Sequence, residues 1–155
     1  MIIKRAKVEN YRAITELFEE LIKEISEKTS KPSKLPPISQ TLELCKYYLE
    51  SETYIVFVAE VDDQIVGFLS LCSSYSLYAG GEFGVIQEFF VSPAHRSKKI
   101  GSKLLVEAIQ SGEKFGWKRI EVATPPLPQF NQSFMFYRNN SFEDGEGRKM
   151  KFIIE

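Results

Sequence analysis

The sequence predicts one α/β domain in which a mixed β-sheet carries helices on both faces. Residues 54–61 and 65–72 are β-rich apolar runs joined by an Asp-Asp turn signal, which is typical of an antiparallel hairpin. Residues 85–124 then have the pattern strand, helix, strand, and the strands of such a unit lie parallel with a right-handed crossover. A chain of 155 residues fits a single domain over residues 1–155.

The first third of the chain is predicted to form a short strand and two helices. Residues 1–6 form the strand, and residues 11–27 form a helix because apolar side chains recur on one face. Three prolines place a loop at residues 28–39. A second helix is expected over residues 40–51, where Ser39 can act as the N-cap.

The remaining segments complete the order of elements. Residues 73–84 contain three glycines and are expected to form a loop. Residues 100–115 form a helix, and Gly116 follows it as a left-handed cap. A short helix is expected over residues 131–139, and residues 142–155 are predicted to form one or two final strands.

Composition excludes several classes of protein. No apolar run approaches the ~20 residues that span a membrane, and the N-terminus mixes charged with apolar residues, unlike a signal peptide. Cys45 and Cys72 lie far apart, and His95 does not complete a common zinc site with them. We therefore expect a cytoplasmic protein with reduced thiols, without a metal and without a membrane partner.

Positive charge is concentrated in one segment, although the net charge of the chain is only -1. Residues 90–119 carry two acidic side chains and seven basic ones, which are Arg96, Lys98, Lys99, Lys103, Lys114, Lys118 and Arg119. A basic segment in an otherwise acidic chain favours a local anionic ligand. A nucleic-acid partner is not expected, because the segment is short, adjoins a helix start and lacks interleaved aromatic residues.

The junction between the first strand and the helix of residues 85–124 is suited to bind a diphosphate. A helix N-terminus exposes unpaired N–H groups and a partial positive charge. Arg96, Lys98 and Lys99 add full charges, and Gly101 lets a ligand approach the first helical turn closely. Neither a P-loop nor a GxGxxG motif is present.

This junction resembles the coenzyme A motif of the GCN5-related N-acetyltransferases (GNAT), which is written Q/R-x-x-G-x-G/A. Arg96 and Gly101 match its ends, and Lys99 stands where the family has its first glycine. Further matches to family patterns extend from Val66 to Phe142. They are Val66-Gly67-Phe68 in the hairpin, Leu104-Leu105 in the helix, Ser133, and Phe136-Tyr137 with Ser141-Phe142 for the pattern F-Y-x-x-x-G-F.

The resemblance implies a mixed, mostly antiparallel sheet of six to seven strands, with splayed central parallel strands and about four helices. In this family the pantetheine arm of acetyl-CoA lies between the splayed strands. The implied contacts to the arm are Phe89, Phe90 and Val91. The implied diphosphate contacts are Arg96, Ser97, Lys98, Lys99, Ile100, Gly101 and Ser102, and Asn131, one place later than the family's asparagine, is a further implied coenzyme contact.

The resemblance also implies acetyl transfer by direct attack of a primary amine within a ternary complex. Glu88 is the implied base that removes a proton from the ammonium, and the alternative is a surface carboxylate. Tyr137 is the implied proton donor to the leaving thiolate, and the alternative is a packed tyrosine whose hydroxyl is satisfied.

The acceptor is expected to be a small-molecule or protein amine. In this family the first helices and the loops around the third and fourth strands shape its pocket. In this chain they offer Glu19, Glu20, Glu24, Tyr75, Tyr78 and Glu82, which would suit a polyamine or an aminoglycoside. The alternative function is a non-catalytic acyl-CoA-binding sensor or interaction module of the same fold. Many members of the family form homodimers, and this is open for the present chain.

Overall fold

The computed structural model describes all of residues 1–155, which form two compact units, Met1–Val122 and Ala123–Glu155. The second unit holds one helix, α4 (Asn131–Asn139). The first unit holds, in chain order, β1 (Ile2–Arg5), the 3-10 turn η1 (Val8–Asn10), α1 (Tyr11–Thr29), α2 (Ile38–Glu50), β2 (Ile55–Val61), β3 (Gln64–Ser76), β4 (Gly81–Val91), the 3-10 turn η2 (Pro93–His95), α3 (Ile100–Phe115) and β5 (Ile120–Val122).

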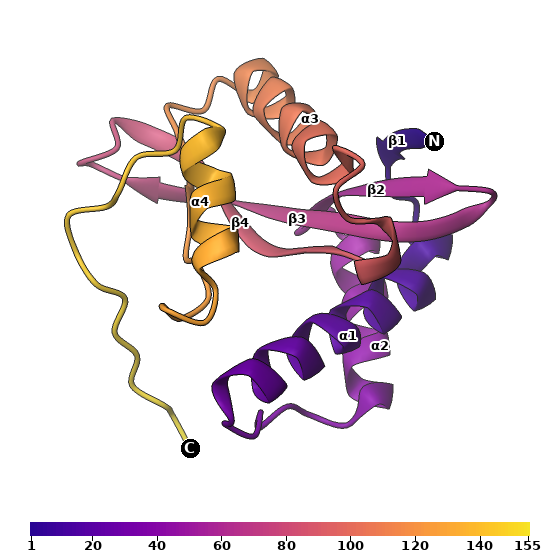
Figure 1. The fold of residues 1–155 in the computed structure, drawn as a ribbon. Coiled ribbons are helices and arrows are strands. Elements are labelled where there is room, and N and C mark those ends of the chain that lie inside the picture. The colour runs from indigo at the N-terminus through magenta and orange to yellow at the C-terminus, as the bar shows by residue number, and fades with distance from the viewer. The chain divides into compact units, whose positions relative to one another are not determined.

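The five strands form one mixed sheet in the order β1-β2-β3-β4-β5. The pairs β1-β2, β2-β3 and β3-β4 are antiparallel. The pair β4-β5 is parallel, as expected for a strand–helix–strand unit. Within the first unit, α3 covers one face of the sheet, and α1 and α2 cover the other (Figure 1). The predicted fold class, a mixed and mostly antiparallel sheet with four helices, is confirmed. No helix has the length and apolar character that crossing a membrane would require.

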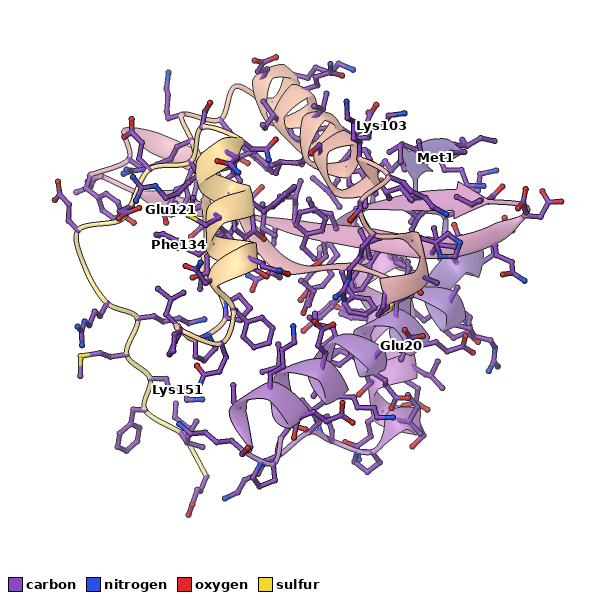
Figure 2. The ribbon with its side chains drawn as sticks, in the orientation of Figure 1. Met1, Glu20, Lys103, Glu121, Phe134 and Lys151 are labelled. Atoms are coloured by element: carbon purple, nitrogen blue, oxygen red, sulfur yellow. The ribbon has the colours of Figure 1, made fainter.

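Apolar side chains fill the space between the sheet and the helices of the first unit (Figure 2). On one face the buried cluster consists of Ile14, Leu17, Val56, Val58, Phe68 and Phe90. On the other face α3 buries Ile100, Leu104, Leu105 and Ala108, whose spacing places them on one side of the helix. This packing on both faces fixes where β4 presents its side chains.

The C-terminal end of α3 is fixed against β4 by a tryptophan. Gly116 has a φ of 75°, so it forms the predicted left-handed cap. Trp117 then folds over Gly84, where an added Cβ would lie 2.2 Å from the indole ring. The indole N–H donates to Glu82 Oε1 at 3.1 Å. A glycine at position 84 is therefore required for the close approach of α3 to the sheet.

The loop predicted for residues 73–84 is wrong for most of its length. β3 continues to Ser76 and pairs there with Gly81, the first residue of β4. Of the three glycines that suggested a loop, Gly80 and Gly81 supply the positive φ values of a short turn, 77° and 133°. Gly84 lies inside the strand, where the indole ring takes the place of a side chain.

The strands predicted for residues 142–155 are absent, so the sheet has five strands rather than six or seven. The segment contains four exposed apolar side chains, Met150, Phe152, Ile153 and Ile154. Its apolar, β-branched composition favoured a strand, but strand propensity takes effect only against a neighbouring strand or a packed face. The segment forms no such ladder, and residues 143–149 are rich in charge and glycine.

Candidate active site

The edge of β4 toward β5 is paired over only three residues. Gly84, Val85 and Ile86 pair with β5, whereas residues 88–91 pair with β3 and not with β5. Gln87 forms a β-bulge. Its two neighbours, Ile86 and Glu88, pair with consecutive residues of β3, so Gln87 has no partner on that strand. Such a bulge bends a strand and redirects its side chains. β5 thus pairs only with the middle of β4, and the pairing stops before the bulge.

Residues Phe89, Phe90 and Val91 lie on the part of β4 that β5 does not pair with. Phe90 is buried, and Phe89 and Val91 are half-buried. Their side chains can pack against the protein while their backbone groups bind a ligand, because backbone hydrogen bonds do not require a particular side chain. This is the position that the family resemblance implied for the pantetheine arm.

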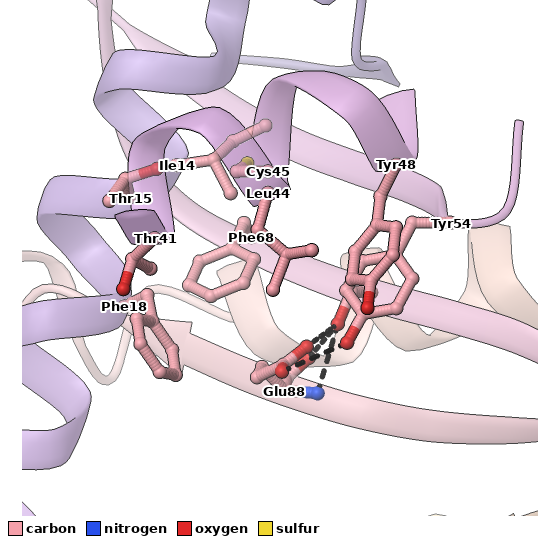
Figure 3. A pocket seen from close by; sticks show the side chains of 11 residues that line it. Ile14, Thr15, Phe18, Thr41, Leu44, Cys45, Tyr48, Tyr54, Phe68 and Glu88 are labelled. Carbon is pink, nitrogen blue, oxygen red and sulfur yellow. Dashed lines mark hydrogen bonds between the residues drawn. The ribbon is translucent and has the colours of Figure 1, made fainter. Parts of the chain in front are cut away.

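Glu88 occupies the same strand and turns its carboxylate toward α1 and α2 (Figure 3). The Tyr54 hydroxyl donates to Glu88 Oε1 at 3.1 Å, and the Ser70 hydroxyl donates to Oε2. Ser70 Oγ also accepts the Glu88 backbone N–H at 2.9 Å. Ser70 on β3 and Tyr54, the residue before β2, therefore hold the Glu88 carboxylate in a fixed orientation.

The environment of Glu88 changes its acidity. Burial raises the pKa of the Glu88 carboxyl above its usual value of 4.5, although the hydrogen bonds from Ser70 and Tyr54 act in the opposite direction. Burial, together with the nearby Glu88 carboxylate, raises the pKa of the Tyr54 hydroxyl well above its usual value. Tyr54 is thus a hydrogen-bond donor at neutral pH, and Glu88 is a stronger base than an exposed glutamate.

A cavity of about 100 Å³ lies beside the Glu88 carboxylate (Figure 3). It is lined by side chains of α1, α2, β3 and β4 and the residue before β2, namely Ile14, Thr15, Phe18, Thr41, Leu44, Cys45, Tyr48, Tyr54, Phe68, Ser70 and Glu88. The rings of Tyr48 and Tyr54 lie 4.7 Å apart, centre to centre. The Thr15 hydroxyl is satisfied by the Tyr11 carbonyl at 2.8 Å, so the lining is mainly apolar with Glu88 as its carboxylate.

The junction between β4 and α3 offers backbone donors. The backbone N–H groups of residues 97–102 have no acceptor in the protein, and the first backbone bond of α3 runs from Lys103 to Lys99. Ser97 and Lys99 have φ values of 65° and 60°, both left-handed. Left-handed residues alternating with right-handed ones form a concave nest of N–H groups that binds anions. Lys99 therefore adopts the left-handed backbone conformation in which the family usually places glycine.

The side chain of Arg96 does not extend toward this nest. Its guanidinium forms two bonds to Glu24, at 3.1 and 2.6 Å, and its Nε donates to the Val91 carbonyl at 2.9 Å. It also lies 5.2 Å from the centre of the Phe90 ring. The Arg96 guanidinium, and Lys28 to a lesser extent, hold the pKa of Glu24 below its usual value. Arg96 thus ties the junction to α1.

The second unit contains the other two residues predicted for the site. Tyr137 is 8% exposed, and its ring packs against Phe136 and Phe142 at centre-to-centre distances of 5.4 and 5.3 Å. Burial raises the pKa of Tyr137 well above its usual value. Asn131 is exposed at the start of α4. Ser141, which replaces the family's glycine, has a φ of 69° and so keeps the left-handed backbone.

The residues suggested from sequence for the acceptor pocket do not line the cavity. Glu24 is paired with Arg96, and Glu82 accepts bonds from Trp117 and Ser73. The others, Glu19, Glu20, Tyr75 and Tyr78, are exposed. Conversely, the sequence did not suggest Tyr54 or Ser70, although one hydroxyl within the apolar run of residues 65–72 was a usable signal.

His95 lies next to the candidate site. His95 is half-buried, and its Nδ1 is buried without a hydrogen-bond partner. Its position at the end of η2 places it after β4 and before the nest. No cluster of three or more His, Cys, Asp or Glu side chains is arranged to hold a metal ion.

The chain is similar in sequence to a family of known proteins. A model of the acetyltransferase (GNAT) family matches residues 14–138, and the chain belongs to this family of acetyltransferases. Over 147 residues the chain is 26% identical to YhfO of Bacillus subtilis, an uncharacterized N-acetyltransferase, which covers 95% of this chain and 93% of that protein. It is 35% identical over 66 residues to an uncharacterized N-acetyltransferase of Archaeoglobus fulgidus, and this match spans 42% of the chain and 45% of that protein.

Solved structures share the fold at low sequence identity. The crystal structure of a predicted acetyltransferase with acetyl-CoA from Clostridium acetobutylicum matches with a TM-score of 0.78 and 12% identity, covering 97% of this chain and 95% of that chain. Identity at this level supports the fold and not the acceptor. The family resemblance drawn from the junction motif is thus confirmed, and the family uses acetyl-CoA as the acyl donor.

Proposed function

We propose that this chain is a single N-acetyltransferase domain that transfers an acetyl group from acetyl-CoA to a primary amine. The observation that carries the proposal is the Glu88 carboxylate, held by Tyr54 and Ser70 beside an apolar cavity. It lies on β4 next to Phe89, Phe90 and Val91, which are beyond the segment that pairs with β5. A base and a stretch of strand that β5 does not pair with are therefore adjacent on β4. The cytoplasmic location expected from the sequence is part of the same proposal.

The coenzyme end of the proposed site depends mainly on backbone groups. The N–H groups of residues 97–102 lack acceptors, which fits a diphosphate, and Phe89, Phe90 and Val91 would contact the pantetheine arm. Lys98 and Lys99 form no ion pair and can add charge. Asn131, one place later than the family's asparagine, is proposed as a further contact. When bound, the coenzyme supplies an acetyl thioester.

Glu88 would act first by accepting a proton from the substrate ammonium, either directly or through a water molecule. An ammonium has no lone pair, so this transfer must precede attack on the thioester carbonyl carbon. The raised pKa of Glu88 brings the carboxylate closer to a matched base at neutral pH. A new C–N bond then forms as the C–S bond breaks.

Tyr137 is proposed as the group that gives its proton to the departing sulfur. The support is its place in the F-Y pattern and its burial, which raises the pKa and keeps the phenol protonated at neutral pH. A protonated phenol can donate to a thiolate. The amine nitrogen loses two protons in all, one to Glu88 before attack and one to solvent as the amide forms. Glu88 then releases its proton to solvent, and Tyr137, which gave one proton to sulfur, is reprotonated by solvent. The products are the amide, the free thiol of coenzyme A and one released proton.

The test is release of free thiol from acetyl-CoA in the presence of an amine panel, with coenzyme binding measured in parallel by calorimetry. The panel comprises alkylamines, polyamines, an aminoglycoside and a short peptide with a free N-terminus. The proposal predicts amine-dependent thiol release and an N-acetylated product by mass spectrometry. Tight coenzyme binding without thiol release from any amine would contradict the proposal and favour an acyl-CoA sensor.

A further inference from the structure

The cavity beside Glu88 has a chemical character that restricts the acceptor. Seven of its lining residues are apolar or aromatic: Ile14, Phe18, Leu44, Cys45, Tyr48, Tyr54 and Phe68. Glu88 is the only carboxylate in the lining, and no lysine or arginine is present. A ligand in this space would meet one negative charge at one end and an apolar wall elsewhere.

We infer that the acceptor is a monoamine whose amino group reaches Glu88 while its apolar group occupies this cavity. The inference rests on the proposed function and deepens it by naming the substrate class. An ammonium near Glu88 gains a charge partner, and the apolar group gains by leaving water. Figure 3 shows the Glu88 carboxylate beside Tyr54, with the rings of Tyr48 and Phe68 also around it.

A polycationic acceptor does not fit the same space. A second ammonium would enter the apolar lining without a partner, and burial of an unpaired charge is strongly unfavourable. None of the carboxylates expected from sequence to attract a polyamine lines the cavity, and two of them are engaged elsewhere. Glu24 binds Arg96 and Lys28, and Glu82 binds Trp117 and Ser73.

The volume of the cavity limits the length of the apolar group. At about 100 Å³ it is smaller than an apolar protein cavity that accepts benzene, so it holds roughly four or five carbon atoms. Each methylene that becomes buried should raise kcat/KM about fourfold, until the cavity is full. Longer chains should then give no further gain.

The first experiment compares amines of equal length. Pentylamine and 1,5-diaminopentane differ only by the second amino group, and thiol release from acetyl-CoA measures kcat/KM for each. We expect pentylamine to exceed the diamine at least tenfold, and ethylamine to lie well below pentylamine. Equal or faster reaction of the diamine, spermidine or an aminoglycoside would overturn the inference while the proposed acetyl transfer stands.

A pair of variants on α2 tests whether this cavity sets the preference. Leu44 lines the cavity and is 45% exposed, so Leu44→Ala should enlarge the space with little effect on folding. The variant should move the optimum toward longer amines such as heptylamine. Tyr47→Ala changes a neighbouring residue that is 60% exposed and outside the lining, and it should leave the optimum unchanged. An unchanged optimum in Leu44→Ala would contradict the assignment.

A labelling experiment reads cavity occupancy without turnover. Cys45 lines the cavity and Cys72 does not, and both are free thiols. Pentylamine should slow modification of Cys45 by methyl methanethiosulfonate at least threefold and leave Cys72 unaffected. Protection of Cys45 without thiol release from acetyl-CoA would retain the binding site and reject the proposed function. Absence of protection would reject the binding site, even if another amine were acetylated.

Discussion

The cavity at Glu88 and the nest at residues 97–102 differ in the chemical groups that form them. The cavity is made of side chains from α1, α2, β3 and β4 and the residue before β2. The nest is a continuous segment whose donors are backbone N–H groups. The cavity should therefore depend on residue identity, and the nest on backbone conformation. Lys99 illustrates the second case, because it replaces a glycine and still has a φ of 60°.

The largest expected effect is the loss of turnover when Glu88, beside the cavity, is changed. Glu88→Gln keeps the size of the side chain but removes the base, so kcat should fall about 10² to 10³-fold. The Kd for coenzyme A should stay within about threefold, because the nest is unchanged. Stopped-flow or steady-state thiol release gives kcat, and calorimetry gives Kd. Glu19→Gln, on an exposed carboxylate of α1, is the matched control and should behave like the wild type. Full activity in Glu88→Gln would show that Glu88 is not the base.

The next effect concerns a single backbone donor of the nest. Ser102→Pro deletes the N–H of the third residue of α3, which has no acceptor within the helix, whereas Ser102→Ala removes only the hydroxyl. Loss of a hydrogen bond to a charged group should weaken coenzyme binding about 10 to 100-fold in the proline variant. The alanine variant should lose less than about threefold. Equal Kd values for the two variants would show that the backbone donor is not used.

A smaller effect concerns the pH dependence of kcat/KM and the hydrogen bond from Tyr54 to Glu88. The base must be deprotonated, so kcat/KM should rise with pH through the pKa of Glu88, which burial places above its usual value of 4.5. The Tyr54 bond lowers that pKa, so Tyr54→Phe should move the acid limb of the profile to higher pH. The rate above the limb should change little. A limb that stays in place, or moves to lower pH, would contradict the assignment of the limb to Glu88.

The smallest effect tests backbone strain in the nest. A left-handed backbone is unfavourable for lysine, so Lys99→Gly should raise the free energy of unfolding by about 0.5–1 kcal/mol. Lys98→Gly, at a position whose φ is not positive, should lower it by a similar amount. Urea denaturation of both variants measures the difference. Destabilisation of equal size in the two variants would mean that Lys99 is not strained.

Local signals explain why the junction could be predicted from the sequence. The helix at residues 100–115 has its apolar spacing, its cap at Gly116 and its basic N-terminal loop within one segment. A spacing motif describes such a site because neighbouring residues form it. The left-handed φ of Lys99 follows from the same motif, although the residue itself is atypical.

The cavity could not be predicted, because its residues meet only after folding. Tyr54 and Glu88 are 34 residues apart, and their bond depends on the order of β2, β3 and β4 in the sheet and on the bulge at Gln87. The pairing of Arg96 with Glu24, which are 72 residues apart, likewise gives no periodic signal. The strands expected in residues 142–155 failed for a related reason, since propensity does not supply a pairing partner.

The most direct test of the account measures kcat at saturating acetyl-CoA and the Kd for coenzyme A in the same preparations of wild type, Glu88→Gln and Ser102→Pro. We expect Glu88→Gln to lose turnover and keep its affinity. We expect Ser102→Pro to lose affinity and keep most of its turnover once the coenzyme is saturating. If the two variants lost turnover and affinity in parallel, the separation between a side-chain acceptor site and a backbone coenzyme site would be wrong.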